Sequence, residues 1–315
     1  MKRKCSVVIA AFNEESSLIL LLNQLVEQLE LLVKEKQITD YEILFVSDGS
    51  TDNSVPILKQ EIKTRPYCKL IVLRRNCGKS YALAAGFRQV TGDIVFTLDA
   101  DLQDDPADLP RFICKLDEGY DLVCGWKRHR QDPLEKILPS KLFNYVTSKI
   151  AGIRLHDFNC GFKAYKRKVI DTIAVYGEFH RYIPVLATRY GFKVTEIPIT
   201  HHKRPFGKSK FGWERYLRGL FDAMSVWFLS KYALCPMYFF GKVALLLVAT
   251  GGILCIYGVL SSAYIMAGLA TLIGIVGAAI ILSLGFIANL LLDHLQQVAP
   301  NGDCIEEIVE PPHEQ

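Results

Sequence analysis

Short apolar runs alternate with longer amphipathic segments along the first 125 residues. Runs rich in valine and isoleucine are typical of buried strands, which we predict at 6–11, 42–47, 70–73, 94–98 and 122–125. Leucines and other apolar residues at helical spacing predict helices over 18–33, 80–89 and 106–118. Because strands and helices alternate, the pattern predicts an α/β fold with a doubly wound, mainly parallel sheet.

The pattern changes near the C-terminal end, where no Asp, Glu, Lys or Arg occurs between Lys242 and Asp293. In a helix, about fifty residues extend about 75 Å, which is two crossings of a ~30 Å hydrocarbon layer and a turn. We therefore expect two transmembrane helices near 243–262 and 266–292, with the turn at 261–264. A buried hairpin of a soluble protein is the alternative, although buried helices rarely run so long without a charge.

The second of these helices carries Ala270, Gly274 and Ala278 at four-residue spacing. Such small residues allow helices to approach closely in lipid, but ordinary use of Gly and Ala in membrane helices explains them equally well. Basic residues precede the hairpin and none lies in its turn, which predicts a plasma-membrane protein with its α/β domain and both termini in the cytoplasm. They are Arg215, Arg218, Lys231 and Lys242.

Composition adds limits to this picture. The net charge of +4 is modest and the basic residues gather at 203–242, so we expect anionic membrane lipid as their partner and no nucleic acid. The nine cysteines are scattered without a C-x-x-C pair, which predicts free thiols and no zinc site. The N-terminal apolar run stops at Asn13, too early for a secretory signal. We divide the chain into an α/β domain (1–200), a basic juxtamembrane lid segment (201–242), a membrane hairpin (243–292) and a short acidic tail (293–315).

Polar residues follow the predicted strands, where ligands bind in doubly wound sheets. After the first strand, Asn13 is expected to cap the next helix, which leaves Phe12 and Glu14 for a ligand. After the second strand stands Asp48, with Thr51 or Asp52 as the next cap, although a turn alone explains either cluster. The glycine patterns of dinucleotide-binding folds and P-loops are absent, which argues against those classes.

The fourth strand is followed by Asp99 and Asp101, and Asp105 and Pro106 are expected to start the next helix. Two carboxylates one residue apart suit Mg²⁺ or Mn²⁺, which often bridges them to a diphosphate. A lone D-x-D also occurs by chance in acidic turns.

The combination is far more specific. Glu14, Asp48 and the Asp99/Asp101 pair at three strand ends, together with 75–79 and 91–93, resemble the nucleotide-sugar site of family-2 glycosyltransferases with the GT-A fold. The segments 156–163 and 202–211 and the paired C-terminal membrane helices are most similar to the polyisoprenyl-phosphate glycosyltransferases. This group includes the bactoprenol glucosyltransferases and dolichyl-phosphate mannosyltransferase. Four residues depart from that pattern and put the donor in doubt: Ala10, Ser47, Cys160 and Lys163.

The resemblance implies a role for individual residues, which we state as expectations. The nucleotide would lie against Ala10, Phe12, Glu14 and Asp48, and the divalent metal against Asp99, Asp101 and Gln103. Arg204 and Lys210 would clamp the donor diphosphate, unless they only adhere to lipid. The acceptor phosphate would meet Lys127, Arg130, Lys136 and Ser140, each of which a solvated charged loop also explains. Asp157 would be the catalytic base or a positioning group, with a backbone hydrogen bond as the structural alternative.

The implied reaction is inverting transfer of a hexose to a polyisoprenyl (undecaprenyl-type) phosphate. UDP-glucose is the first choice of donor, then GDP-mannose, then a UDP-linked amino sugar, and a homo-oligomer is left open. A lipid phosphate is already ionised near neutral pH, because its second pKa is about 6, so it needs no strong base. Two rivals are a polysaccharide synthase, which lacks support because no Q-x-x-R-W occurs, and a non-catalytic scaffold, which would be expected to lose some of the site residues.

Overall fold

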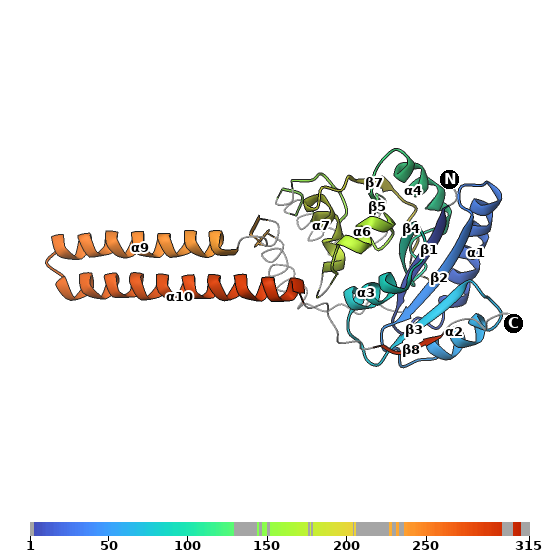
Figure 1. Ribbon diagram of the computed structural model, residues 1–315, viewed down its shortest axis with the longest axis horizontal. Coiled ribbons are helices and arrows are strands. Elements are labelled where there is room, and N and C mark those ends of the chain that lie inside the picture. Colours follow the sequence, from blue (N-terminus) through green and yellow to red (C-terminus); the bar gives the residue numbers. More distant parts are fainter. Residues whose placement is uncertain are drawn as a thin grey trace. The chain divides into compact units, whose positions relative to one another are not determined.

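The computed structural model describes residues 3–128, 144, 147–149, 152–175, 177, 179–203, 205, 227–228, 231–232, 236–297 and 305–309. The chain forms two compact units, of which the first comprises Met1–Ala223 together with Cys304–Gln315 and the second comprises Met224–Asp303 (Figure 1). Each unit is described by itself.

The first unit is built on a sheet with the strand order β7-β5-β6-β4-β1-β2-β3-β8. β1 pairs in parallel with β2 and β4, and β2 pairs in parallel with β3. β6 runs antiparallel between β4 and β5, while β8 runs antiparallel to β3 at the edge. The strands are β1 (Lys4–Ala11), β2 (Asp40–Ser47), β3 (Cys68–Leu73), β4 (Ile94–Asp99), β5 (Leu122–Trp126), β6 (Lys163–Lys166), β7 (Val194–Pro198) and β8 (Ile305–Val309).

Helices pack on both faces of this sheet. Val7 and Ile9 of β1 belong to one buried cluster with the leucines of α1 and with residues of α2 and α4. Val8 points to the opposite face, where a Cβ atom added to Gly86 of α3 would lie 2.4 Å from its Cγ1 atom. The described helices of this unit are α1 (Leu18–Lys34), α2 (Ser54–Ile62), α3 (Lys79–Gln89), α4 (Leu109–Asp117), α6 (Arg167–Thr172), α7 (Ile183–Arg189) and the 3₁₀ turns η1 (Pro106–Asp108) and η2 (Phe179–Arg181).

The predicted doubly wound, mainly parallel α/β fold is therefore confirmed, as are the five strands and three helices expected from the apolar pattern. Three strands were not expected, namely β6, β7 and β8. β8 lies within the predicted acidic tail and pairs with the edge strand of the first unit's sheet.

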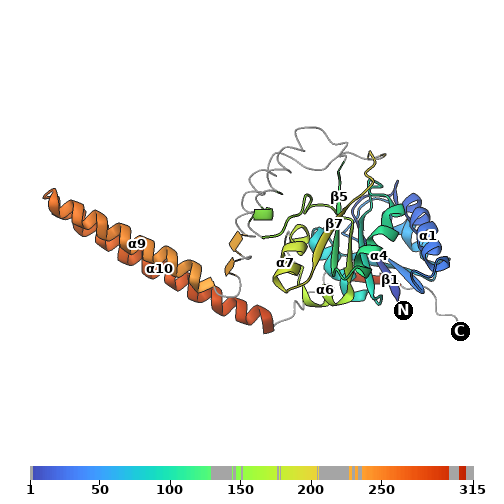
Figure 2. The same ribbon diagram turned by 90° about the horizontal axis from the view of Figure 1, so that it is seen from above.

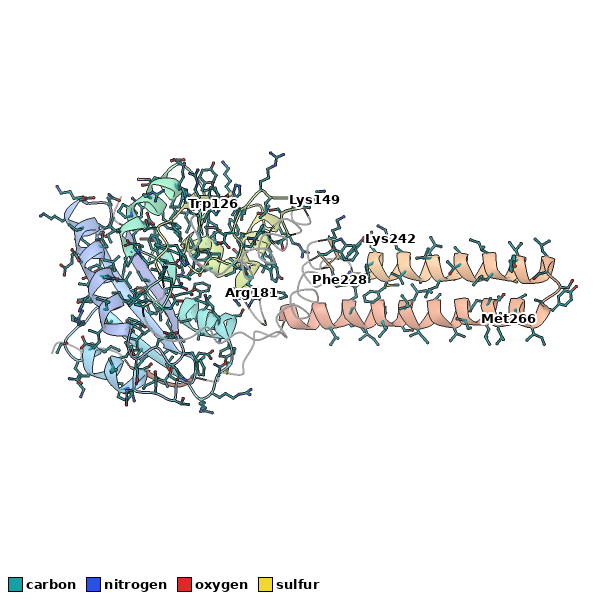
Figure 3. The ribbon with its side chains drawn as sticks, turned by 180° about the vertical axis from the view of Figure 1, so that it is seen from behind. Trp126, Lys149, Arg181, Phe228, Lys242 and Met266 are labelled. Atoms are coloured by element: carbon teal, nitrogen blue, oxygen red, sulfur yellow. The ribbon has the colours of Figure 1, made fainter. Side chains whose placement is uncertain are left out.

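The second unit is a hairpin of α9 (Pro236–Leu260) and α10 (Tyr264–Gln297), which lie side by side in Figures 1 and 2. Both helices are long and apolar enough to cross a membrane. They touch through small residues, because a Cβ atom on Gly274 would lie 3.3 Å from the Cα atom of Gly251. Most large apolar side chains point away from this contact, as Figure 3 shows around Met266, and Leu260 and Ile265 are each 81% exposed. A hairpin buried in a soluble core would hide these side chains.

Candidate active site

The carboxyl ends of four strands meet at one edge of the sheet. Ala10 of β1 lies opposite Val46 of β2 on one side and opposite Asp99 of β4 on the other. Since β1, β2, β3 and β4 are parallel, the loops that follow them all leave from this edge. The sequence predicts the nucleotide and the metal at this place.

The loops after β1 and β2 are joined by hydrogen bonds. The Thr51 backbone N–H donates to Asn13 Oδ1 at 2.8 Å, and the Glu14 backbone N–H donates to Ser54 Oγ at 3.1 Å. Asn13 has a φ of 54°, a left-handed conformation that asparagine tolerates better than most residues. The prediction that Asn13 caps the first helix is therefore wrong, because its side chain binds the neighbouring loop and Ser17 stands at the N-cap of α1.

The start of α2 also differs from the prediction. Its N-cap residue is Asn53, not Thr51 or Asp52. Asp52 nevertheless supports the helix start, since its Oδ1 atom accepts the Ser54 backbone N–H at 3.0 Å. The expected cap is confirmed before η1, where the Asp105 side chain accepts the Ala107 backbone N–H at 2.9 Å.

Asp48 holds the loop that leads into α3. Its two carboxylate oxygens accept the backbone N–H groups of Cys77 at 2.7 Å and Gly78 at 3.0 Å. Burial raises the pKa of this carboxyl, although both hydrogen bonds act to lower it. Each oxygen keeps a second lone pair, so the expected contact of Asp48 with a nucleotide is compatible with this positioning role. Ala10, Phe12 and Glu14 are partly exposed at the same edge.

Asp99 ends β4 and is in contact with a cation. The Lys79 ammonium, at the start of α3, donates to Asp99 Oδ1. Burial acts to raise the pKa of Asp99, but the charge and hydrogen bond of Lys79, together with the charges of Lys127 and Lys163, outweigh burial and hold this pKa well below its usual range. A Cβ atom on Gly161 would lie 2.4 Å from Asp99 Oδ1, so glycine allows the segment before β6 to approach the carboxylate.

Asp101 turns back on its own loop, where its Oδ1 atom accepts the Gln103 backbone N–H at 3.2 Å. Among the residues that the structure describes, no three His, Cys, Asp or Glu side chains form a metal-binding group. Two aspartates and the amide oxygen of Gln103 nevertheless fit Mg²⁺ or Mn²⁺, because such ions often take one or two carboxylates and complete their shell with phosphate and water. The ammonium at Asp99 shows that this position already accommodates positive charge.

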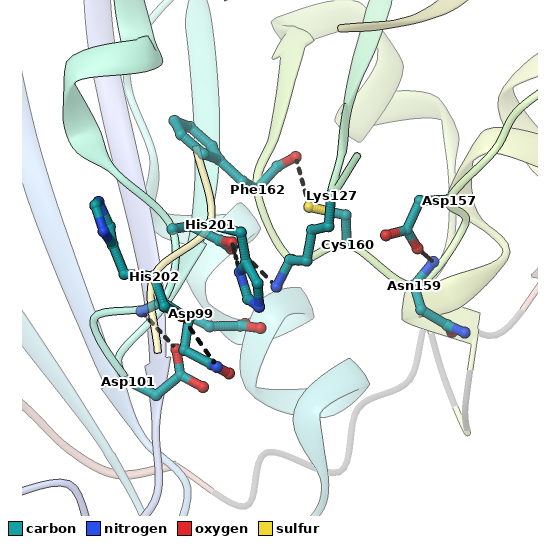
Figure 4. A network of polar contacts seen from close by, with 12 residues as sticks. Asp99, Asp101, Lys127, Asp157, Asn159, Cys160, Phe162, His201 and His202 are labelled. Carbon is teal, nitrogen blue, oxygen red and sulfur yellow. Dashed lines mark hydrogen bonds and ion pairs between the residues drawn. The ribbon is translucent and has the colours of Figure 1, made fainter. Parts of the chain in front are cut away.

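A buried ion pair lies beside these aspartates (Figure 4). Lys127 Nζ, at the end of β5, lies 3.0 Å from Asp104 Oδ1, and the two side chains are 13% and 0% exposed. Burial acts to lower the pKa of Lys127, but Asp104 and other neighbouring acidic groups together raise it above its ordinary value. The pKa of Asp104 is lowered in turn, against the effect of burial, by Lys127 and His201, so the pair is charged. Lys127 is expected at the acceptor phosphate, whereas the structure turns its ammonium toward Asp104.

The first residues of the predicted lid segment, His201 and His202, are attached to the same loop. His201 Nδ1 lies 3.6 Å from Asp104 Oδ1, and His202 Nε2 lies 3.0 Å from Asp105 Oδ2. The His202 backbone N–H also donates to the Gln103 carbonyl at 2.8 Å. Sequence reasoning missed these contacts, because they join residues almost one hundred positions apart, and the segment 202–211 that begins with His202 gave no indication of its partner.

Asp157 is buried, and its Oδ1 atom accepts the Asn159 backbone N–H at 3.0 Å. Figure 4 shows its side chain apart from Asp99 and Asp101, beyond Cys160. The alternative weighed from the sequence was a bond to the backbone of the turn 154–158, whereas the observed bond is to Asn159, one residue beyond that turn. Nearby, the Lys163 ammonium donates to the Cys160 carbonyl, so two of the four departures from the family pattern lie in contact with each other.

Five expected site residues lie outside the described residues, and their roles stay predictions. They are Arg130, Lys136 and Ser140 for the acceptor phosphate, and Arg204 and Lys210 for the donor diphosphate.

Comparison with known proteins gives a family and a fold. The family model described as glycosyl transferase family 2 matches residues 6–174, more than half of the chain. A mannosyltransferase from Pyrobaculum calidifontis, solved in complex with GDP-Man and Mn²⁺, is 18% identical with a TM-score of 0.53, over 95% of this chain and 89% of that one. Glucosyl-3-phosphoglycerate synthase from Mycobacterium tuberculosis, in complex with Mn²⁺, UDP and phosphoglyceric acid, is 18% identical with a TM-score of 0.50, over 72% and 78%. These two structures show the GT-A-like fold, and the family match shows that the chain belongs to glycosyl transferase family 2 and is a nucleotide-sugar glycosyltransferase.

Proposed function

We propose that this enzyme transfers a hexose, with UDP-glucose as the first choice of donor, to a polyisoprenyl phosphate of the undecaprenyl type. The observation that carries the proposal is the union of a family-2 glycosyltransferase unit with an apolar helical hairpin in one chain. A soluble acceptor needs no membrane segment next to the enzyme that glycosylates it. A polyprenyl phosphate carries its reactive group at the membrane surface, which such a hairpin would keep within reach of the enzyme.

The return of the chain to the sheet supports the proposed cytoplasmic position of both termini. The chain leaves the first unit before α9 and contributes β8 to the same sheet after α10. A hairpin that crosses the membrane twice returns the chain to the side on which it started, where β8 can pair with β3. A single crossing would leave β8 and β3 on opposite sides of the membrane. The basic residues between 203 and 242 favour the cytoplasmic side.

For the donor, we propose that the nucleotide binds at the carboxyl edge of β1 and β2, against Ala10, Phe12, Glu14 and Asp48. Asp99, Asp101 and Gln103 would hold Mg²⁺ or Mn²⁺, which supplies positive charge for the departing nucleoside diphosphate. The mannosyltransferase of the same fold was solved with GDP-Man and Mn²⁺, which supports a divalent ion beside a nucleotide sugar. Arg204 and Lys210 would add charge from the lid.

For the acceptor, the ionised lipid phosphate would attack the anomeric carbon directly and invert its configuration. Because this nucleophile already carries charge at neutral pH, Asp157 serves in our proposal to position the acceptor or the sugar hydroxyls. Its burial and its bond to the Asn159 backbone N–H support this role, because they fix the direction of the carboxylate. Arg130, Lys136 and Ser140 would receive the acceptor phosphate.

Transfer of label from a panel of donors tests the proposal. Membranes that contain the full chain are incubated with undecaprenyl phosphate and radiolabelled UDP-glucose, GDP-mannose or UDP-N-acetylglucosamine. We expect label from UDP-glucose in the lipid extract, and none with Asp99→Ala or in EDTA. Label from GDP-mannose in the lipid would show that the donor is GDP-mannose and would leave the proposed reaction class unchanged. Transfer only to a water-soluble phosphate such as 3-phosphoglycerate would contradict the lipid acceptor.

A further inference from the structure

Lys79 is the last residue of the segment 75–79 that resembles the nucleotide-sugar site of the family, but the proposed reaction assigns it no individual role. It is the first residue of α3, and its ammonium contacts Asp99 Oδ1 across the carboxyl edge of the sheet. The Lys79 and Asp99 side chains are 30% and 28% exposed, so small ions can reach the pair. The partner of Lys79 is thus one of the two carboxylates proposed to bind the metal.

The backbone around Lys79 is held from both sides. Before it, Asp48 accepts the backbone N–H groups of Cys77 and Gly78. After it, Ser80 Oγ lies 2.9 Å from His180 Nδ1 and accepts the His180 backbone N–H at 3.0 Å. These contacts keep the start of the helix beside Asp99.

This arrangement creates competition for one carboxylate. A divalent cation on Asp99 would meet a neighbouring ammonium of the same sign, and like charges a few ångströms apart repel. Gly161 limits how far Asp99 can turn away, because the segment that contains it lies directly against the carboxylate. When a metal binds, Lys79 is the group that has to move.

We propose that Lys79 is a tethered counter-ion of the metal site, which neutralises Asp99 while no divalent cation is bound and yields that carboxylate to the metal. The released ammonium stays at the start of α3, where it faces the donor diphosphate. This inference rests on the proposed metal site at Asp99 and Asp101, and on a diphosphate donor, but not on the identity of the acceptor. In this arrangement the enzyme binds the divalent cation weakly when no donor is bound, and more tightly when the donor is bound.

Metal binding without turnover tests the proposal. The full chain in detergent is titrated with Mn²⁺, and free Mn²⁺ is followed by its electron paramagnetic resonance signal, with and without UDP. Lys79→Met keeps the length of the side chain and removes its charge, whereas Lys79→Arg keeps the charge. Lys115→Met is the matched control, since Lys115 pairs with Glu118 on the exposed surface of α4.

One neighbouring charge commonly changes the affinity of a site for a cation by about tenfold or more. Without UDP, Lys79→Met should therefore bind Mn²⁺ about tenfold more tightly than the wild type, while Lys79→Arg and Lys115→Met stay within about twofold of it. UDP should strengthen Mn²⁺ binding less in Lys79→Met than in the wild type. Unchanged or weaker Mn²⁺ binding by Lys79→Met would overturn the proposal.

A further variant separates this inference from the proposed reaction. Asp99→Asn should abolish the Mn²⁺ site, and persistence of wild-type Mn²⁺ binding in that variant would overturn the role of Lys79 as its counter-ion. The titration needs neither lipid nor sugar transfer. A wrong acceptor would consequently appear in the labelling experiment and leave the Mn²⁺ result unaffected.

Discussion

Replacement of Lys127 by methionine distinguishes two roles for this residue, one in stability and one in acceptor binding. At 3.0 Å from Asp104 Oδ1 and an effective dielectric constant of about 20, the attraction is about 332/(20 × 3.0), or about 5.5 kcal/mol. Desolvation of the two ions offsets much of this attraction. Removal of one partner leaves the Asp104 carboxylate buried without its cation, which typically costs about 3–5 kcal/mol.

Thermal unfolding of the full chain in detergent, followed by intrinsic fluorescence, measures this cost. For a unit of this size, about 3–5 kcal/mol corresponds to a fall of about 6–20 °C in Tm. The double variant Lys127→Met/Asp104→Asn should recover more than half of that fall, because it removes both charges of this ion pair and leaves neither of them unpaired. Lys115→Met, which breaks an exposed ion pair with Glu118, should leave the Tm close to that of the wild type, because solvent screens exposed ion pairs.

A Tm of Lys127→Met within about 2 °C of the wild type would refute the reasoning, since it corresponds to no more than about 1 kcal/mol. If the KM for lipid phosphate rose at the same time, Lys127 would serve the acceptor, as the sequence predicts. A lower Tm that Asp104→Asn rescues would assign Lys127 to the ion pair.

Three further variants test other parts of the site. Gly161→Ala places a Cβ atom 2.4 Å from Asp99 Oδ1 and should weaken Mn²⁺ binding, measured by titration, by about tenfold or more. Burial, together with the nearby charges of Lys79 and Arg181, lowers the pKa of His180 to about 2, so the folded state resists a proton that the unfolded state binds. The wild type should therefore lose up to about 1.4 kcal/mol of stability per pH unit below about 6.5, and His180→Gln should show a shallower fall of Tm between pH 7 and 5. Asp157→Asn should lower turnover and leave UDP affinity, measured by competition, nearly unchanged; lost affinity with normal turnover would contradict the positioning role.

Much of the fold could be predicted from local pattern because buried parallel strands are continuous apolar runs. β1 and β2 each carry at least five consecutive buried residues, which makes both strands visible in the sequence. β6 has only four residues, with a lysine at each end, and β7 is mostly half-buried, so neither has a clear signal. β8 reads Ile-Glu-Glu-Ile-Val within an acidic tail, without a clear strand alternation, and only its pairing with β3 identifies it as part of the sheet.

For the candidate site, the pattern of the sequence predicted which residues lie at strand ends, but it did not predict which groups their side chains contact. Asp48, Asp99 and Asp101 fall at the carboxyl ends of strands, where parallel topology gathers the loops. Which groups they touch depends on segments that are distant in the sequence. Asp48 binds a loop about thirty residues away, and Asp99 contacts Lys79 twenty residues before it. Asn13 shows the same limit, since a long-range hydrogen bond displaced the expected local cap.

The acceptor is the central claim, and reconstitution of the purified full chain tests it most directly. The enzyme in lipid vesicles receives radiolabelled UDP-glucose and Mn²⁺ with either undecaprenyl phosphate or 3-phosphoglycerate, and Asp99→Ala serves as the inactive control. We predict that label enters the organic phase only when undecaprenyl phosphate is present, as a product in which the sugar configuration is inverted. Label that stays in the aqueous phase as glucosyl-phosphoglycerate, with none in the lipid, would contradict the account.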